Sequence, residues 1–577
     1  MTSPSRLQAA TMWLSAAVVF VGSWLYRFND PNGSFGGLTD DHFFYLVRGW
    51  QILLGDLPVR DFVDHGAPLY YYVAAAVQLI GGRGTLSELV FSAGALSFSA
   101  ALTFWLARRA SGSIVLGLAA AGFQVLLEPR FYNYPKILVY ALAIPVIWAF
   151  IDDQSTRRRF WMAAVTAVAF LFRHDHGVFV AIAAGLAIAL LVRLPARERV
   201  KHAVVYVATV IALVSPYLVF IQLHGGVAHY FRQATTWAEQ DRGRTPAVWP
   251  GLFDNPDGVS DAASRGGPVA RPVAVLRDNW VAWMFYLEIV LPFVALAGVL
   301  VSRRGFRAPW PYAREKIAVV AALAFVLDVG FLRHPLAARL ADPFVPHAVL
   351  VAWMVAACLV VLRRGREEVS PRLPGATRVA AGLFALATAV IVFVAVSALT
   401  YDLHRRLDKA GLVEGPRRAV RRTILVGSRL KQVWPLENWT SPDTPGVMRL
   451  AFYLRDCTGP SDRVFMQPYL PQVLALAQRG FAGGHADLRA GFFRTPEAEA
   501  LTLERLRRQS VSVAVVAAEP EFSSFLEAYP RIAEHFDAHY RTAGEQALDG
   551  RFSVVLLVEN SLVPTGTYAP LGWPCFR

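Results

Sequence analysis

The sequence predicts an α-helical polytopic membrane protein that ends in a soluble α/β domain. Of its 577 residues, 55% are hydrophobic and only 17% are charged, whereas an ordinary soluble domain is about a quarter charged. Several apolar runs reach the roughly 18–22 residues that a helix needs to cross about 30 Å of hydrocarbon. The last third of the chain is more polar and alternates short strand-like runs with helical patterns.

The apolar runs predict about eleven transmembrane helices, at 7–26, 85–106, 113–128, 136–151, 160–173, 177–193, 203–223, 280–301, 317–332, 345–362 and 378–400. The first run is long, and no small-residue cleavage site follows it, so we interpret it as a span and not as a cleaved signal peptide. The segment 68–82 is short for a span and carries three tyrosines at one end. We expect it to lie at the membrane interface as a juxtamembrane helix.

Charge placement fixes the expected topology. Basic clusters fall at 108–109, 157–159, 193–201, 303–316 and 363–378. Eleven spans with a cytoplasmic N-terminus put all five clusters inside, as the positive-inside rule requires. The formal net charge of +14 then follows from topology, and it implies no nucleic-acid partner. We expect a multi-pass protein of the cell (inner or plasma) membrane.

This topology predicts two domains. Residues 1–400 form the transmembrane domain, with outer loops at 27–84, 128–136, 173–177, 224–279 and 331–343. Residues 401–577 form an extracytoplasmic α/β domain with strands at 463–468, 511–518 and 551–560 and helices at 447–456, 470–480, 496–509 and 520–529. Cys457 and Cys575 lie in this domain and either pair in an oxidising compartment or remain two thiols. Cys358 lies in a span. No Cys/His cluster suits zinc, and no phosphate-binding loop for ATP is present.

The stretch from Thr39 to Tyr72 carries the candidate chemistry. Asp40 and Asp41 open an amphipathic segment at the membrane edge, where charge is costly and rarely incidental. Apolar residues follow at helical spacing, while Asp41, Tyr45 and Arg48 share the opposite face. The alternative is a purely structural role, in which Thr39 is the N-cap residue and the two carboxylates only stabilise the start of the helix. The same loop also holds further polar residues, namely Asp61, Asp64 and His65.

This stretch resembles the first outer loop of GT-C glycosyltransferases, in particular the bacterial relatives of protein O-mannosyltransferase and of the lipid A aminoarabinose transferase. Those enzymes carry an acidic pair after the first span, then an amphipathic helix, a Gly-x-x-Pro, an Asp-Phe and a Pro-containing interfacial helix. The matching residues here are Asp40, Asp41, Tyr45, Gly55, Pro58, Asp61, Phe62 and Pro68. Some relatives have a Lys just before the last Pro, where this chain reads HGAP. A donor contact from that Lys must therefore come from elsewhere, or from His65.

The resemblance implies an inverting transfer of a sugar from a polyprenyl phosphate at the outer face of the membrane, to an envelope glycan, lipid or protein. Asp41, or Asp40 beside it, would deprotonate the acceptor hydroxyl as general base. Cationic and phenolic groups would surround the departing phosphate. The candidate substrate-binding residues are Tyr45, Asp61, Asp64, His65, Arg130, Tyr132, Tyr134, Lys136, Arg173, His174, His176, Arg333 and His334.

Two other functions remain open from the sequence. A transporter or flippase for lipid-linked saccharides would also have many spans and outer-side cations. It should show internal repeats and polar residues deep along several spans, whereas this chain concentrates its polarity at one face. A non-catalytic scaffold for envelope assembly would make the loop acids incidental. No cofactor is firmly implied, although adjacent carboxylates at Asp40 and Asp41 can hold a divalent cation.

Overall fold

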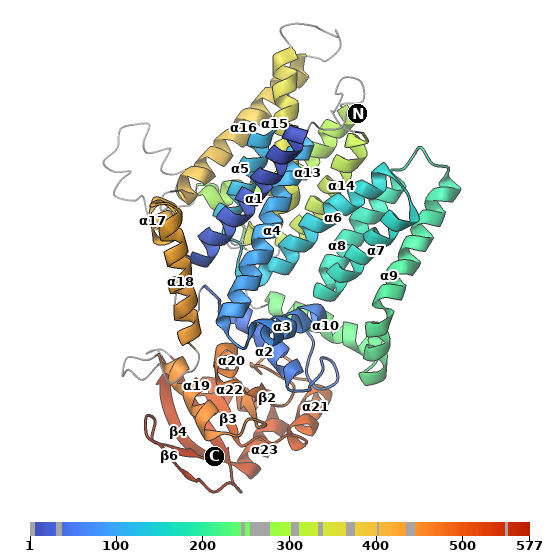
Figure 1. Cartoon of the computed structure of the whole chain (residues 1–577). Coiled ribbons are helices and arrows are strands. Elements are labelled where there is room, and N and C mark those ends of the chain that lie inside the picture. The colour runs from blue at the N-terminus through green and yellow to red at the C-terminus, as the bar shows by residue number, and fades with distance from the viewer. Residues whose placement is uncertain are drawn as a thin grey trace. The chain divides into compact units, whose positions relative to one another are not determined.

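The computed structural model describes residues 6–29, 37–243, 248–253, 277–301, 311–332, 339–364, 375–400, 403–433, 445–548 and 552–577. The chain divides into two compact units, each built from segments far apart in the sequence (Figure 1). Unit 1 comprises 1–30, 92–214 and 246–423, and unit 2 comprises 31–91, 215–245 and 424–577. The predicted division near residue 400 stays a prediction.

Unit 1 is helical. Its elements are α1 (Arg6–Asn29), most of α4 (Thr85–Ser111), α5 (Ile114–Leu126), the short turn η1 (Phe131–Asn133), α6 (Tyr134–Asp152), α7 (Thr156–Phe172), α8 (His174–Ala189), most of α9 (Ala196–His224), α13 (Trp280–Val301), α14 (Ala313–Phe331), α15 (Phe344–Arg364), α16 (Gly375–Leu399), α17 (Leu403–Lys409) and the first half of α18 (Pro416–Gln432). Helices α6, α7, α8 and α14 pack side by side, and α13 packs on α14, α15 and α16.

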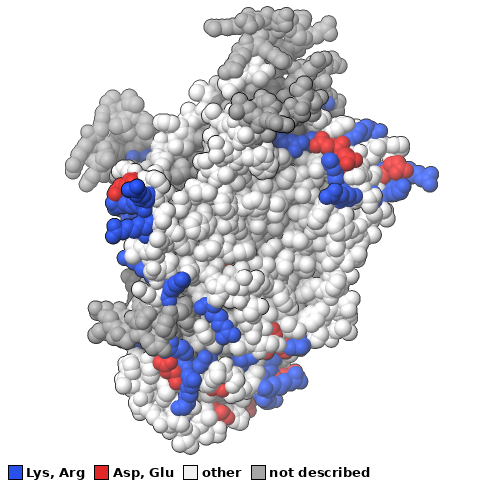
Figure 2. Space-filling model, in the orientation of Figure 1, with Lys and Arg blue, Asp and Glu red and all other residues white. Residues whose placement is uncertain are grey.

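Described residues from four of the predicted basic clusters lie at one end of unit 1, whereas residues 302–310 and 365–374 of the last two clusters lie outside the described part. Asp152, at the end of α6, accepts from Arg109 (3.2 Å) at the end of α4 and from Lys316 near the start of α14. Figure 2 shows further Lys and Arg side chains gathered over the start of α9. At the opposite end, Lys136 and Asp342 pair at 3.0 Å. The orientation of the helices in a membrane stays a prediction.

Several helices have the length and composition of membrane spans. Within the described residues, four qualify: Thr85–Ser111, Phe131–Asp152, Ala196–His224 and Trp280–Leu300. A bent pair, Leu386–Leu399 and Leu403–Lys409, would make a fifth. Shorter apolar helices occur at Ile114–Leu126, His174–Ala189 and Phe344–Val360. A helical protein with several apolar helices is thus observed, and the number of eleven spans stays a prediction.

Unit 2 begins with two helices of the first predicted outer loop. Helix α2 (Asp40–Leu53) packs on α3 (Pro68–Gly81). They approach closely at Gly49, where an added Cβ would lie 2.8 Å from the backbone nitrogen of Ala75. Helices therefore form where the sequence predicts an amphipathic segment after Thr39 and a helix at 68–82, and the place of the second helix at the membrane interface stays a prediction. Helix α10 (Val227–Gly243) belongs to the same unit.

A five-stranded sheet forms the rest of unit 2, in the order β2-β1-β3-β5-β4. Its strands are β1 (Arg463–Met466), β2 (Gly480–Phe481), β3 (Val513–Ala517), β4 (Tyr540–Leu548) and β5 (Phe552–Glu559). The first three strands are parallel, and β5 and β4 join them in antiparallel fashion. The surrounding helices are α19 (Gly446–Cys457), α20 (Pro471–Ala477), α21 (Pro496–Arg507), α22 (Glu521–Ala528) and α23 (Pro530–His539). The core on one face includes Phe465, Val516 and Phe536.

The end of the chain is tied back to the start of the sheet region. A two-stranded ribbon of β6 (Gly566–Tyr568) and β7 (Trp573–Cys575) follows the sheet. Cys575 forms a disulfide with Cys457 at the end of α19, and Phe576 N donates to the Cys457 carbonyl at 3.1 Å. Of the two alternatives left open by the sequence, the structure has the paired cysteines.

Candidate functional site

The carboxylate of Asp41 lies in the first turn of α2 and is held by a residue 428 positions away. The Tyr469 hydroxyl donates to Asp41 Oδ1 at 2.8 Å. Thr39 occupies the N-cap position, but its side chain makes no capping hydrogen bond. Asp40 is the first residue of the helix, and its side chain lies outside the described part. The long-range bond shows that the Asp41 side chain is not limited to capping its own helix.

Tyr469 comes from the carboxyl edge of the parallel strands. Chain segments leave β1 and β2 at this edge, and β1 has β2 on one side and β3 on the other. Because the order of the strands reverses around β1, this edge is a topological switch point, where open α/β sheets bind ligands. Arg489, which follows β2, lies 4.5 Å from the centroid of the Tyr469 ring and pairs with Asp487 at 2.8 Å. A carboxylate, a phenol and a guanidinium thus meet at this edge.

A second cation lies along the same helix. Arg48 is 1% exposed; its guanidinium carbon lies 3.5 Å from the Phe44 ring centroid, and Nη1 donates to the Phe44 carbonyl at 2.7 Å. Its Nη2 lies 3.4 Å from Nδ1 of His65. Within the described residues, no carboxylate pairs with Arg48. A buried charge without a counter-ion is costly, and its field favours negative charge nearby.

His65 is a neutral hydrogen-bonding group. Burial lowers its pKa well below 6.5, and the positive charge of Arg48 adds to this effect. Because Nδ1 faces a guanidinium donor, Nδ1 accepts and the ring proton sits on Nε2. His485, which also follows β2, has its pKa lowered to about 3 by burial and by the charge of Arg505. Both histidines are therefore uncharged near neutral pH, and His65 offers a donor rather than a cation.

Asp64 is saturated by structural hydrogen bonds. Its Oδ1 accepts from the backbone nitrogens of Gly66 (2.9 Å) and Ala67 (3.0 Å). Its other oxygen accepts from the hydroxyls of Tyr217 and Tyr230. Burial, together with the charge of Asp64, raises the pKa of Tyr230. These donors describe a carboxylate that orders the turn before α3.

Tyr45 stacks on its neighbour in α3, with 4.1 Å between its ring centroid and that of Tyr70. Asp61 closes its own loop, because its Oδ2 accepts from the Leu57 backbone nitrogen at 2.7 Å and from Arg60 Nε at 2.8 Å. Substrate binding by Tyr45, Asp61, Asp64 and His65 stays a prediction. All four lie in unit 2 with Asp41.

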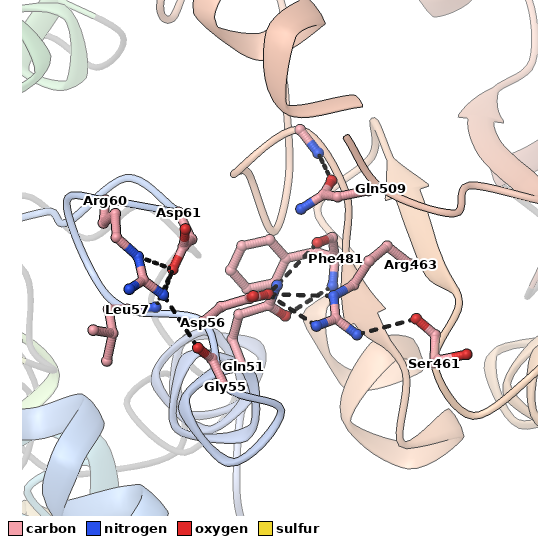
Figure 3. A network of polar contacts seen from close by, with 11 residues as sticks. Gln51, Gly55, Asp56, Leu57, Arg60, Asp61, Ser461, Arg463, Phe481 and Gln509 are labelled. Atoms are coloured by element: carbon pink, nitrogen blue, oxygen red, sulfur yellow. Dashed lines mark hydrogen bonds and ion pairs between the residues drawn. The ribbon is translucent and has the colours of Figure 1, made fainter. Parts of the chain in front are cut away.

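Helix α2 is hydrogen-bonded to the β2 edge of the sheet (Figure 3). The buried amide of Gln51 donates from Nε2 to the Phe481 carbonyl at 3.1 Å and accepts at Oε1 from the Phe481 nitrogen at 3.0 Å. Asp56 just after the helix pairs with Arg463 of β1 at 3.1 Å. Gly480 permits this approach, since an added Cβ would lie 2.9 Å from Gln51 Oε1. The side chain of Gln51 thus pairs with edge strand β2 as a further strand would.

The other predicted residues lie at the end of unit 1 opposite the basic clusters, where they pair locally. Lys136 and Asn133 both reach Asp342, at 3.0 and 2.8 Å. Arg173 pairs with Asp175 at 2.7 Å. The remaining contacts are Arg130 Nη1 to the Tyr132 hydroxyl (2.9 Å), His174 Nδ1 to the Phe170 carbonyl (2.9 Å), and His176 Nδ1 to the Tyr140 hydroxyl. Tyr134 is buried. Their role in binding substrate stays a prediction.

Two predicted residues, Arg333 and His334, lie outside the described residues. Within the described part, no group of three or more His, Cys, Asp or Glu side chains has the arrangement of a metal site. A divalent cation at Asp40 and Asp41 therefore stays a prediction.

Sequence reasoning missed the residues that follow β1 and β2, namely Tyr469, His485, Asp487 and Arg489. A signal for them existed, because they directly follow parallel strands, where such sheets place their ligands. The missing step was the strand order, which the sequence pattern alone does not supply.

Comparison with known proteins finds similar proteins by structure and none by sequence. No protein-family model matches the sequence, and no curated protein sequence matches it. Two similar solved structures are crystal structures of ArnT, a lipid A aminoarabinose transferase of the GT-C superfamily, from Cupriavidus metallidurans. The structure bound to undecaprenyl phosphate has 14% identity and a TM-score of 0.45, covering 96% of this chain and 98% of that one. The apo structure has 15% identity and a TM-score of 0.43, covering 95% and 98%. The family resembled by residues 39–72 is the family that this comparison returns, and no residue assignment depends on it.

Proposed function

We propose that this protein is a membrane glycosyltransferase. It transfers a sugar from a polyprenyl-phosphate-linked donor to an envelope acceptor at the outer face of the membrane, with inversion and with Asp41 as general base. The observation that carries the proposal is the placement of Asp41, ordered by Tyr469, at the carboxyl edge of the parallel strands.

The chemistry needs a carboxylate within hydrogen-bond reach of the acceptor hydroxyl. Tyr469 donates to one oxygen of Asp41, which orients the carboxylate, and a carboxylate can accept several hydrogen bonds at once. Deprotonation raises the nucleophilicity of the acceptor oxygen. That oxygen attacks the anomeric carbon as the bond to the phosphate breaks on the opposite face, and the leaving phosphate carries away the bonding electrons.

The leaving group sets a second requirement, because a phosphate dianion needs donors and cations close by. Arg489 and the ring proton of His65 are the candidates beside Asp41, and the buried charge of Arg48 adds to the positive field. Because neutral His65 carries a proton on Nε2, it can donate a hydrogen bond to the phosphate without first being protonated. Together these groups replace the Lys that some relatives of the resembled family carry before the last proline of the loop.

The disulfide between Cys457 and Cys575 supports the outer location of the sheet region, because structural disulfides persist in oxidising compartments and are rare in the cytosol. The site of unit 2 would then face the periplasm or the exterior, where lipid-linked donors are consumed without nucleotide sugars.

The test uses purified protein in nanodiscs with a panel of radiolabelled polyprenyl-phosphate sugars and a membrane extract as acceptor source. We expect wild type to release polyprenyl phosphate from one donor and Asp41→Asn to lose this activity by at least about a hundredfold, as loss of a general base implies. The variant Asp40→Asn shows which of the two carboxylates is the general base. Asp537→Asn, on the exposed face of α23, is the matched control. No turnover of any donor by folded wild type would refute the proposal.

One observation favours the transporter alternative. Glu288 of α13, Asp328 of α14 and His347 of α15 are buried inside unit 1, and His347 Nε2 lies 3.2 Å from Asp328 Oδ2. Intramembrane acids often mark transport pathways. If Glu288→Gln stops translocation of a fluorescent lipid-linked saccharide in proteoliposomes while Asp41→Asn does not, the transporter function replaces the transferase.

A further inference from the structure

Helix α18 has a composition unlike that of the other described helices. It holds six Lys or Arg residues and no Asp or Glu in 17 residues. Its hydrophobic residues are Ala419, Val420, Ile424, Leu425, Val426 and Leu430. Helix α17 before it adds the basic residues His404, Arg405, Arg406 and Lys409. Neither helix entered the proposed transfer chemistry.

Buried Asn29 fixes the α17–α18 hairpin to the end of the first apolar helix, and an ion pair between Arg406 and Glu128 adds a second attachment. Asn29, the last residue of α1, is fully buried, and its Nδ2 donates to the carbonyls of Ala410 and Ala419, both at 3.0 Å. Thr423 donates to Asn29 Oδ1 at 2.8 Å, and Arg422 Nε donates to the Asn29 carbonyl at 3.1 Å. The hairpin is therefore held where the apolar surface of α1 ends.

The outer surface of α18 carries exposed aliphatic and basic side chains interspersed with one another. Ala419, Val426 and Leu430 face inward and are almost fully buried, whereas Val420 and Ile424 are 57% and 64% exposed. Arg417, Arg421 and Arg429 are exposed, and no described residue forms an ion pair with them. Figure 2 shows Lys and Arg gathered over α17 and α18. Exposed aliphatic residues interspersed with arginines on one helix are typical of helices that lie on an anionic lipid surface.

We propose that α18 docks on an anionic phospholipid bilayer surface. The apolar residues Val420 and Ile424 enter the headgroup boundary, and Arg417, Arg421 and Arg429 pair with lipid phosphates. A lipid surface fits better than an acidic protein, because the hairpin is fixed to the end of a helix whose own exposed face carries Trp13, Leu14, Val18 and Val21. The consequence goes beyond the proposed function: the protein has a preference for anionic lipid that is independent of its donor.

The first measurement places an environment-sensitive dye on the helix. Val420→Cys is labelled in a Cys358→Ser background, and emission is compared in nanodiscs of phosphatidylcholine alone and of a mixture rich in phosphatidylglycerol. We expect a blue shift and quenching by headgroup-labelled lipid in the anionic discs, weakened by high salt. Val563→Cys, at an exposed aliphatic position in the loop before β6, is the control and should show neither change.

The second measurement removes the exposed positive charges of α18 and keeps the hydrogen bonds that hold the helix to Asn29. Arg417→Gln/Arg421→Gln/Arg429→Gln leaves Arg422 and its contact with Asn29 intact. We expect enrichment of phosphatidylglycerol over phosphatidylcholine in co-purified lipid to fall by about fivefold for each charge that reaches the surface. If this variant does not fold, the salt dependence of the wild-type dye signal tests the proposal instead. A blue shift in anionic discs that high salt does not weaken then overturns it. Equal emission at 420 and 563 in both discs overturns the proposal, as does a shift that appears only on adding membrane proteins.

Discussion

Replacing Gln51 by alanine tests whether α2 depends on the sheet edge for its position. The change removes both bonds to Phe481 (3.1 and 3.0 Å) and leaves a buried strand N–H and C=O unpaired. Each unsatisfied buried group costs about 1–3 kcal/mol, so the two together should cost unit 2 roughly 2–6 kcal/mol. For a domain of this size, that corresponds to a fall in melting temperature of roughly 4–24 °C.

The assay is thermal unfolding in detergent, followed by hydrogen exchange of the peptide that contains Phe481. We expect the amide of Phe481 to lose protection and the rate of sugar transfer to fall, because the same helix carries Asp41. Gln51→Glu keeps the shape but loses the donor, and it places a second carboxylate beside Asp56, so it should be at least as destabilising. Gln546→Ala on edge strand β4 is the matched control. A melting temperature of Gln51→Ala within a degree of wild type would refute the role of Gln51 as a strand surrogate.

Three further outcomes are expected. Tyr469→Phe should slow transfer by about tenfold to a hundredfold with unchanged melting, since a bond to a charged group contributes about 1.5–3 kcal/mol; an unchanged rate would separate Tyr469 from catalysis. Asp64→Asn should lower the melting temperature, because it weakens the hydrogen bond from Tyr230 and three others, and unaltered melting would contradict this. The folded-state pKa of His485, about 3, lies below its unfolded value of about 6.5, so stability should be full above pH 6.5 and fall by up to about 1.4 kcal/mol per pH unit below it. His485→Gln should reduce this dependence in a melting series over pH, and His229→Gln on an exposed position should not.

Local patterns predicted the elements well. The expected strands at 511–518 and 551–560 appear as β3 (Val513–Ala517) and β5 (Phe552–Glu559), and the expected helix at 496–509 appears as α21. Strand periodicity and helical spacing are properties of neighbouring residues, so a single sequence contains them. The acidic start of α2 could be predicted from the sequence for the same reason.

Partners across the chain could not be predicted. Arg48 was expected on the polar face of α2 beside Asp41, and the structure buries it between aromatic rings, because the sheet region covers that face. The pairing of Asp41 with Tyr469 depends on strand order, and the saturation of Asp64 depends on hydroxyls more than 150 positions away. Such contacts follow from tertiary packing, to which residue spacing gives no access.

The separation between Asp41 and Tyr469 has a consequence for biosynthesis. At a synthesis rate of about 5–20 residues per second, Tyr469 is made on the order of a minute after Asp41. Phe481 follows Gln51 after a similar interval. During this interval the segment that carries Asp41 lacks the strands that order it. Any product truncated before β1 therefore lacks an ordered Asp41, whatever its transmembrane helices have achieved. The sheet region must therefore be complete before Asp41 can be ordered by Tyr469.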